Sequence, residues 1–482
     1  MPEFLSGLLV GTAAIVTALV LVAGFSAILH WGHDREHGLV PYIFYPAVLV
    51  VSLGVLFSGR NLDIPSDIGW VTMAKHPVLV WAGRAASVFI TFAAAERILR
   101  RWFHFGPRPP VPTPLILALF VYFFTNVGTS ALLSAHPSVS HEYLYMLLAG
   151  YAALLVTRQE GDMAIASARN AILAFLVLSA LCLLWRPELE LIRGYKGLIP
   201  WLDVRYTGLA IHPNGLGPIV VVFLLCVWAR PYRARWINVA AWIIGGASLL
   251  LSQSKTNWVA LLVCALCMAY FRNRERLVHR FFDFRKPGAP VGTLVTAMVA
   301  TAALGMLLIF GGMEERLAGF LHSGTGTDLM SFMGRRQIWE AAVDEWANNP
   351  VFGYGLTIWD EAHRARIGIP EAFQAHSQFF QSISSSGSLG AAGLAAYVAV
   401  LFWYTLKTTA ATGGLSLALF LLIVIGAISE VPLEMTGFGM EQLLHLLTLM
   451  VIASRCAPEN SPAATRHAPL FRPLRARHVH QD

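Results

Sequence analysis

Long apolar runs, separated by short segments that hold most of the charge, constrain this chain more than any other feature. A helix needs about 20 apolar residues to cross the hydrocarbon core of a bilayer, and its backbone groups must then be satisfied within the segment itself. The chain is 56% hydrophobic and only 13% charged, whereas soluble domains are about 25% charged. Alternating runs of about ten residues, which are typical of membrane barrels, are absent. The sequence therefore predicts an all-α, polytopic integral membrane helical bundle of about 12 to 14 transmembrane helices.

The predicted transmembrane spans follow the apolar runs, and we favour a count of about 13. They cover residues 5–29, 40–57, 78–95, 115–133, 143–156, 164–185, 217–228, 237–251, 259–271, 294–310, 389–406, 415–428 and 443–453. The first run is long and has no basic stretch before it. We therefore interpret it as a mature helix rather than as a signal peptide.

The positive charges in the segments between the spans predict how the chain is oriented in the membrane. Arginines and lysines gather in residues 97–108, 230–235, 272–286 and the tail, and such short basic loops favour the cytoplasm. The same bias accounts for the net charge of +7, so we expect no nucleic-acid partner. We divide the chain accordingly into transmembrane helices at 1–310 with a short periplasmic segment at 187–216, a large and partly helical periplasmic loop at 311–386, C-terminal transmembrane helices at 387–455, and a disordered cytoplasmic tail at 456–482.

The external segment before the span at 217–228 combines a fixed cation with an irregular backbone. Arg205 can bind a phosphate through two parallel hydrogen bonds. His212 and Asn214 add neutral donors and acceptors on either side of Pro213. Irregular backbone at membrane depth usually lines a cavity. The alternative is a capped helix start, with Arg205 reaching toward lipid head groups.

Two further external segments carry cations. Lys255 lies in a very short polar turn, where it is either part of an anion site or an ordinary turn residue. Arg335 and Arg336 open a predicted amphipathic helix. Its apolar stripe consists of Trp339, Val343 and Trp346, flanked by Ile338 and Ala342. Cations at a helix start oppose its dipole, and an anion bound there would also meet free N–H groups. The pair therefore either binds an anion or faces head groups and solvent.

The end of the large loop holds a histidine within an apolar pattern. If this stretch is helical, His376 shares a face with Phe373, Phe380 and Ile383. Such burial favours the neutral imidazole, which can act as a general base near neutral pH. A buried histidine with a satisfied hydrogen bond is the structural alternative. Gly387 allows close helix packing or a break before the next span.

One spacing in this region is distinctive, because His376 and Ser377 are followed by nine residues, Gly387, two residues and Gly390. This pattern resembles the signature of the O-antigen ligase family. The resemblance covers about residues 205 to 390, whereas the chain before it matches only in hydropathy. Three upstream segments also resemble the family: Arg205…Gly208…His212-Pro-Asn214, Ser252-Gln-Ser-Lys255, and Gly334-Arg335…Trp339…Pro350…Gly353-Tyr-Gly355.

The resemblance implies a membrane glycosyltransferase, similar to the GT-C type, at the periplasmic face of the bacterial inner membrane. Its donor would be a glycan on undecaprenyl diphosphate and its acceptor lipid A–core, another glycan or a protein, with membrane lipids around it. The site residues implied are a catalytic His376 and, for the diphosphate and substrate, Arg205, Arg335, Arg336, Lys255, His212 and Asn214. We find no Asp-x-Asp pair or metal-spaced cluster in the sequence. We therefore expect an enzyme without a metal or other cofactor. The one-step displacement that the resemblance implies would invert the anomeric carbon.

Two alternatives remain compatible with the sequence. O-antigen or exopolysaccharide polymerases and protein O-oligosaccharyltransferases would use the same donor with a different acceptor. A polysaccharide transporter belongs to another class. Arg84 and Glu430, which are ionisable residues in or near spans, are the features that favour a transporter.

Overall fold

The computed structural model describes Gly24, Ser26 and residues 37–63, 76–103, 110–195, 202–281, 333–370, 372–437 and 439–456. Three predicted features lie almost wholly outside these residues: the spans at 5–29 and 294–310, and the tail at 456–482. The first part of the large loop, up to residue 332, also lies outside them.

The secondary-structure elements of the described chain are all helices apart from one small hairpin, which confirms the predicted all-α class. The elements before the hairpin are η1 (Val40–Tyr42), α2 (Phe44–Leu56), α4 (Pro77–Trp102), α5 (Thr113–Phe123), the π-helix η2 (Phe124–Gly128), α6 (Thr129–Leu133), α7 (Tyr143–Ala153), α8 (Arg158–Trp185) and η3 (Pro187–Leu189). The hairpin consists of β1 (Leu191–Arg193) and β2 (Val204–Tyr206), and it is followed by α9 (Pro213–Ala229), α10 (Arg235–Leu251), α11 (Lys255–Phe281), α15 (Met333–Asn348), α16 (Glu361–Arg366), α17 (Gln378–Thr409), α18 (Leu415–Ala427) and α19 (Met440–Ala453).

Most of these helices are apolar. Every predicted span that falls on described residues coincides with one of them. Four segments of the described chain are long and apolar enough to cross a membrane: Pro77–Trp102, Thr113–Leu133, Arg158–Trp185 and Gln378–Thr409. The remaining spans coincide with shorter apolar helices or with α11. The chain is therefore an all-α membrane protein.

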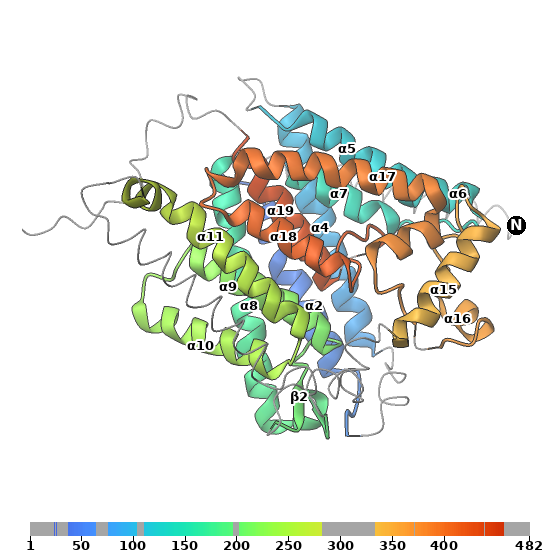
Figure 1. The fold of residues 1–482 in the computed structure, drawn as a ribbon, viewed down its shortest axis with the longest axis horizontal. Coiled ribbons are helices and arrows are strands. Elements are labelled where there is room, and N and C mark those ends of the chain that lie inside the picture. The colour runs from blue at the N-terminus through green and yellow to red at the C-terminus, as the bar shows by residue number, and fades with distance from the viewer. Residues whose placement is uncertain are drawn as a thin grey trace, which may run out of the picture.

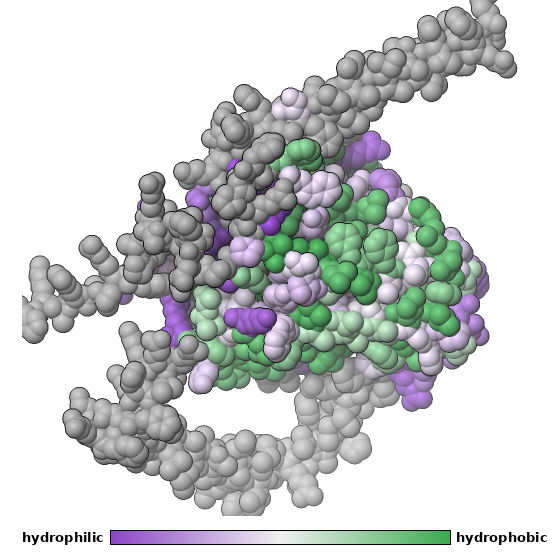
Figure 2. Space-filling model, turned by 90° about the horizontal axis from the view of Figure 1, so that it is seen from above, coloured by the Kyte–Doolittle hydropathy of each residue, from purple (hydrophilic) through white to green (hydrophobic). Residues whose placement is uncertain are grey.

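The centre of the bundle is α9, which packs against α8, α10, α11, α18 and α19 (Figure 1). Its residues from Ile219 to Val227 are all buried, as expected for a helix that is apolar on every side. Outer helices instead expose large apolar side chains, such as Trp81 on α4 and Leu184 on α8. Figure 2 shows apolar residues across much of the described surface and hydrophilic residues mainly at its edges. Such a surface suits contact with lipid.

Local sequence explains where several helices begin. Proline occupies the first turn of α4, α5 and α9, where its missing N–H costs nothing. Thr157 and Glu160 form a capping box at the start of α8, which satisfies two backbone donors. These signals and the apolar runs together account for the helix pattern.

The turn that follows α15 packs against α17 at a kink in that helix. Gly387 has φ +65° inside α17, a conformation that glycine adopts without strain. The Tyr354 N–H donates to the Ser384 carbonyl at 2.8 Å. A Cβ on Gly353 would lie 2.6 Å from the Ser385 backbone, so only glycine allows this approach. The kink brings the large loop onto the start of α17.

The α15 helix is present as predicted, and one side of its apolar stripe is buried. Ile338 is 5% exposed and Ala342 is fully buried, whereas Val343 is 39% exposed. The Trp339 ring stacks on Phe380, with their centroids 4.9 Å apart. The buried face of α15 is therefore centred on Ile338 and Ala342, which flank the predicted stripe.

The hairpin replaces a segment that the sequence indicated only as an irregular loop. Ile192 of β1 pairs with Arg205 of β2. The buried Arg60 holds the chain on both sides of the hairpin, since it donates to the Leu189 carbonyl at 2.7 Å and to the Gly208 carbonyl at 3.0 Å. These bonds fix the position from which the Arg205 side chain extends.

Candidate functional site

Arg205 is held by contacts at several points of its guanidinium group. Its Nε donates to the Ser252 carbonyl at 3.0 Å, and its Nη2 donates to Asn214 Oδ1 at 2.8 Å. The group also lies 4.9 Å from the centroid of the Tyr195 ring. Burial lowers the pKa of Arg205, and Tyr195 partly offsets this effect. Arg205 is therefore a positioned cation rather than a side chain free to reach head groups.

His212 and Asn214 lie at the first turn of α9. His212 is the N-cap, and its Nδ1 accepts from the Asn214 N–H at 3.1 Å. His212 is exposed to solvent. Desolvation by nearby protein atoms nevertheless lowers the pKa of His212 to about 4, and the Arg205 cation adds to the shift. His212 is thus neutral near pH 7. Asn214 links Arg205 to Glu430, because its Nδ2 donates to Glu430 Oε1 at 3.4 Å.

The polar turn before α11 contacts the hairpin. Gln253 has φ +48°, and its side chain donates to the Leu202 and Val204 carbonyls at 3.2 and 2.8 Å. The neighbouring Ser252 carbonyl is the one that Arg205 contacts. Lys255 is the first residue of α11, so it lies close in sequence to these contacts.

The two adjacent arginines of α15 have different surroundings. Arg335 Nη2 lies 3.6 Å from Glu430 Oε1, and the Arg335 side chain is 22% exposed. Arg336 pairs with Glu340 one turn along α15 at 2.7 Å, and both side chains are exposed. Burial lowers the pKa of Arg335, and Glu430 opposes that shift. Consecutive helical residues are about 100° apart around the axis, so α15 directs only Arg335 toward Glu430.

Glu430 is the carboxylate at which these segments meet. It follows α18, and its side chain is 12% exposed. Gln374 Nε2 donates to Glu430 Oε2 at 2.6 Å, and His376 Nδ1 lies 3.3 Å from the same oxygen. The other oxygen accepts from Asn214 and faces Arg335. We call these five residues the Glu430 cluster.

His376 lies outside any helix, so the expected helical face with Phe373 and Phe380 is wrong. It precedes α17 and has φ +48°, which costs a non-glycine residue roughly 1 kcal/mol or more. The side chain is 28% exposed. Nearby bonds hold this conformation, because the Ala375 N–H donates to Gln381 Oε1 at 2.9 Å and Trp339 Nε1 donates to the Ala375 carbonyl at 2.9 Å. The turn directs the ring at Glu430.

Glu430 is the residue whose place in the site the sequence reasoning missed. In the sequence it stands out only as an ionisable residue that, like Arg84, favours a transporter. Arg84 lies on the exposed surface of α4 with its guanidinium 5.2 Å from the Trp81 ring centroid. Glu430 instead lies beyond the end of its apolar helix, in contact with Arg335 and His376. An acidic residue directly after an apolar run was the available signal.

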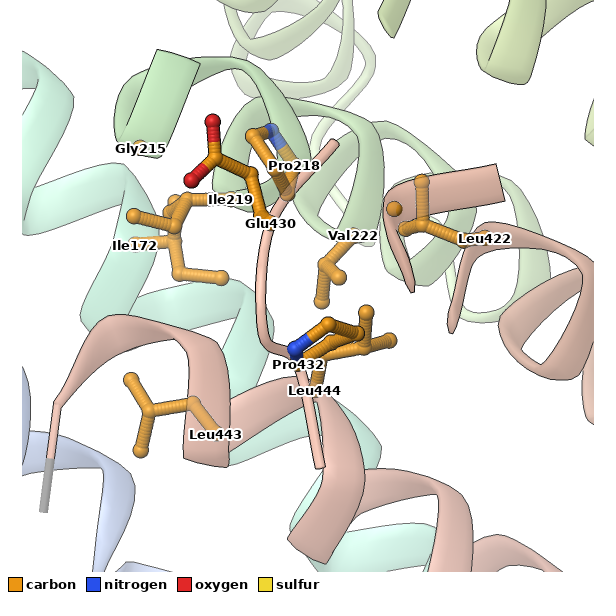
Figure 3. A pocket seen from close by; sticks show the side chains of 11 residues that line it. Ile172, Gly215, Pro218, Ile219, Val222, Leu422, Glu430, Pro432, Leu443 and Leu444 are labelled. Carbon is orange, nitrogen blue, oxygen red and sulfur yellow. The ribbon is translucent and has the colours of Figure 1, made fainter. Parts of the chain in front are cut away.

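An apolar pocket lies beside Glu430 (Figure 3). Glu430 is its single charged lining residue, and the other lining residues are apolar or glycine. Its walls come from α8, α9, α18, α19 and the segment after α18, and include Ile172, Pro218, Val222, Leu422, Pro432 and Leu444. The pocket thus puts an apolar surface directly beside the Glu430 carboxylate.

A model of the O-antigen ligase family matches residues 239–395, which is less than half of the chain. The match supports assignment to the O-antigen ligase family. It includes Arg335 and His376, begins after Arg205, and ends before Glu430. No curated protein matches the chain.

The match to the O-antigen ligase family model supports only general statements about function. It supports a multi-pass membrane enzyme that resembles O-antigen ligases and polymerases. It also indicates a glycosyltransferase-like activity on glycan and lipid-linked substrates in general.

Proposed function

We propose that the protein is an inner-membrane glycosyltransferase that moves a glycan from undecaprenyl diphosphate to a hydroxyl group of lipid A–core in lipopolysaccharide synthesis. The observation that carries this proposal is the convergence of Arg335, His376 and, through Asn214, Arg205 on Glu430 beside an apolar pocket. A lipid diphosphate needs cations for its head group and an apolar surface for its chain. The positive-inside tendency of the short basic loops supports a periplasmic location for these segments.

Arg205 and Arg335 would bind the diphosphate of the donor. Glu430 lies 3.6 Å from Arg335, beyond hydrogen-bond distance, so a more highly charged diphosphate can replace it. Both guanidinium groups are partly buried, where electrostatic interactions are stronger than in water. They would stabilise the charge that develops on the leaving diphosphate. This role is our reason for proposing a reaction without a metal or other cofactor.

His376 would act on the acceptor. A hydrogen bond from protonated Nδ1 to Glu430 leaves Nε2 as the basic ring nitrogen. In one step, Nε2 accepts the proton of the acceptor hydroxyl, the oxygen forms a bond to the anomeric carbon, and the bond from that carbon to the diphosphate breaks. Undecaprenyl diphosphate leaves, and a single displacement inverts the anomeric configuration.

The decisive experiment is transfer by the purified protein in lipid nanodiscs, with an undecaprenyl-diphosphate glycan as donor and lipid A–core as acceptor. We expect His376→Ala and Arg335→Ala to lower turnover by about 100-fold or more. Arg336→Ala is the matched control on the same helix. A folded Arg335→Ala or His376→Ala protein with normal turnover would contradict the assigned roles, and a product that retains its anomeric configuration would exclude the single displacement.

The acceptor is tested separately in a deletion strain. Lipid A–core that lacks polymer indicates a ligase, single repeat units indicate a polymerase, and an unglycosylated protein indicates a protein O-oligosaccharyltransferase. A strain that accumulates the lipid-linked donor on the cytoplasmic side would instead favour a transporter.

A further inference from the structure

We propose that Tyr122 and Gln378 are positioning residues of the transfer site, which hold the chain segment that carries Glu430 against the segment that carries His376. The inference rests on the proposed function. Glu430 lies in the stretch between α18 and α19, whose described residues 428–437 form no helix. We call this stretch the Glu430 segment. Its geometry depends on contacts with the rest of the protein.

Leu433 is where the Glu430 segment is held. Its backbone N–H donates to Gln378 Oε1 at 2.8 Å, and its carbonyl accepts from the Tyr122 hydroxyl at 2.8 Å. The Gln378 side chain also donates to the Tyr122 hydroxyl at 3.4 Å. Leu433, Tyr122 and Gln378 are all buried, so water does not compete for these bonds. Gln378 comes two residues after His376, and the same contacts therefore join both halves of the site.

Tyr122 is itself firmly placed. Its ring stacks on Tyr397, with centroids 5.0 Å apart and an angle of 5° between the rings. The Tyr397 hydroxyl in turn bonds His445 Nε2 at 2.5 Å. Both tyrosines are almost fully buried. Because the Tyr122 ring is held in place, its hydroxyl fixes the position of Leu433 relative to α5.

The helix that carries Tyr122 contacts α17 on both sides of the kink. After Tyr122 the helix continues into the π-helix η2, a feature that is frequent at functional sites. Asn126 of η2 donates to the Gly390 carbonyl at 2.8 Å and accepts from the Ser382 hydroxyl at 2.9 Å. Gly387 lies between these two contacts along α17. The α5–η2 helix thus aligns the start of α17 with the Glu430 segment.

This alignment affects the chemistry because the contacts of Glu430 with His376 and Arg335 are long. His376 and Arg335 lie 3.3 and 3.6 Å from its oxygens. A displacement of less than 1 Å breaks a hydrogen bond of 3.3 Å, and a misplacement of about 1 Å can lower a rate by about 100-fold. Tyr122 and Gln378 would act on turnover through Glu430, without touching the substrate.

The first test compares Tyr122→Phe with Tyr397→Phe. Both changes remove one hydroxyl from the same buried ring stack, but only the first removes a bond to the Glu430 segment. In nanodiscs, with an undecaprenyl-diphosphate glycan and lipid A–core, we expect Tyr122→Phe to lower kcat by about tenfold and to leave KM for the donor within about twofold. Tyr397→Phe should keep kcat with a similar loss of thermal stability. Equal kcat values for the two variants would overturn the proposal.

The second test combines Tyr122→Phe with Glu430→Gln. If Tyr122 acts through Glu430, its substitution lowers kcat in the wild-type protein and has little further effect in the Glu430→Gln background. Fully additive effects would show that Tyr122 acts by another route and would overturn the assignment.

A third measurement does not depend on activity. Hydrogen exchange of the full-length protein in nanodiscs should be faster in residues 428–437 for Tyr122→Phe and for Gln378→Met, and unchanged for Tyr397→Phe. Faster exchange with no transfer by the wild-type protein would retain the positioning contacts and reject the proposed function. Unchanged exchange in Tyr122→Phe would reject the positioning role, whatever the activity.

Discussion

Glu160 and Glu430 both join distant parts of the chain, but their oxygens are bonded very differently. Glu160, in the first turn of α8, accepts from the Gly38 N–H and from Arg97 at 2.9 Å each, and from the Thr157 N–H at 2.7 Å. Its side chain is 1% exposed. Both oxygens of this carboxylate are therefore occupied by short hydrogen bonds.

Among the residues that the structure describes, Glu430 makes one short contact. Gln374 donates to it at 2.6 Å, whereas His376, Asn214 and Arg335 lie 3.3, 3.4 and 3.6 Å from its oxygens. Its side chain is 12% exposed, and an apolar pocket lies beside it.

The difference suggests how a buried charge is used in each place. Short bonds from backbone and arginine satisfy Glu160 fully, and such a carboxylate stabilises the packing of α4, α8 and the chain before α2. In the proposed mechanism, the long contacts of Glu430 would let it exchange partners when a substrate binds. Charge and burial alone do not separate these two roles, whereas bond length and neighbouring space do.

The largest expected effect is on stability at the tightly bonded carboxylate. Arg97→Met leaves Glu160 buried without its cation, and breaking a buried pair in this way costs about 3–5 kcal/mol. Unfolding of the purified protein in mixed detergent micelles measures the loss. Arg84→Met, which changes an exposed arginine on the same helix, is the control. Equal stability of the two variants would show that the bonds of Glu160 do not stabilise the fold, which is how we distinguish it from Glu430.

The opposite pattern is expected at Glu430. Glu430→Gln should lower transfer by about 100-fold, because one accepting oxygen becomes an NH2 donor and His376 loses the negatively charged partner that orients its ring. The free energy of unfolding should change by less than about 1 kcal/mol, since the substitution weakens mainly long hydrogen bonds. Parallel transfer and unfolding measurements on one preparation decide the point. A stability loss as large as that of Arg97→Met would mean that Glu430 is a structural carboxylate as well.

A third carboxylate predicts a pH dependence of stability. Glu190 is fully buried near Arg60, and burial raises its pKa from 4.5 to about 7. The folded protein therefore binds this proton more tightly than the unfolded chain, and stability is lost as the pH rises from about 4.5 through 7. Glu190→Gln should remove about 1–2 kcal/mol of that loss. Unfolding temperatures at pH 5 and pH 8 test this, and an equal pH dependence in both proteins would contradict it.

The smallest effect is expected at Arg336. It is exposed and, within the part of the chain that the structure describes, pairs with Glu340 alone, and exposed pairs along a helix contribute little. Arg336→Ala should leave the unfolding temperature unchanged and transfer within about twofold. Arg335→Ala, one residue earlier, should abolish most of the transfer. Similar losses in both variants would show that the substrate reaches Arg336 and that the rotation of α15 differs in the bound state.

Part of the candidate site could be predicted from the sequence. The cations Arg205 and Arg335 and the histidine His376 were found because they stand in polar segments between apolar runs. The choice between Arg335 and Arg336 depended on how α15 rotates against α17, which the sequence does not specify. The conformation of His376 was mispredicted, because the apolar residues around it matched a helical pattern that the turn before α17 overrides.

By itself the sequence determined that this is a bundle of membrane helices and where those helices lie. Hydropathy and helix capping act over a few neighbouring residues, so they can be read from the chain directly. The tertiary structure alone decided that Glu430 meets Arg335 and His376, and that Tyr122 holds the segment between α18 and α19. These contacts join residues more than 50 positions apart, and their geometry follows from the packing of helices whose apolar faces are compatible with many arrangements.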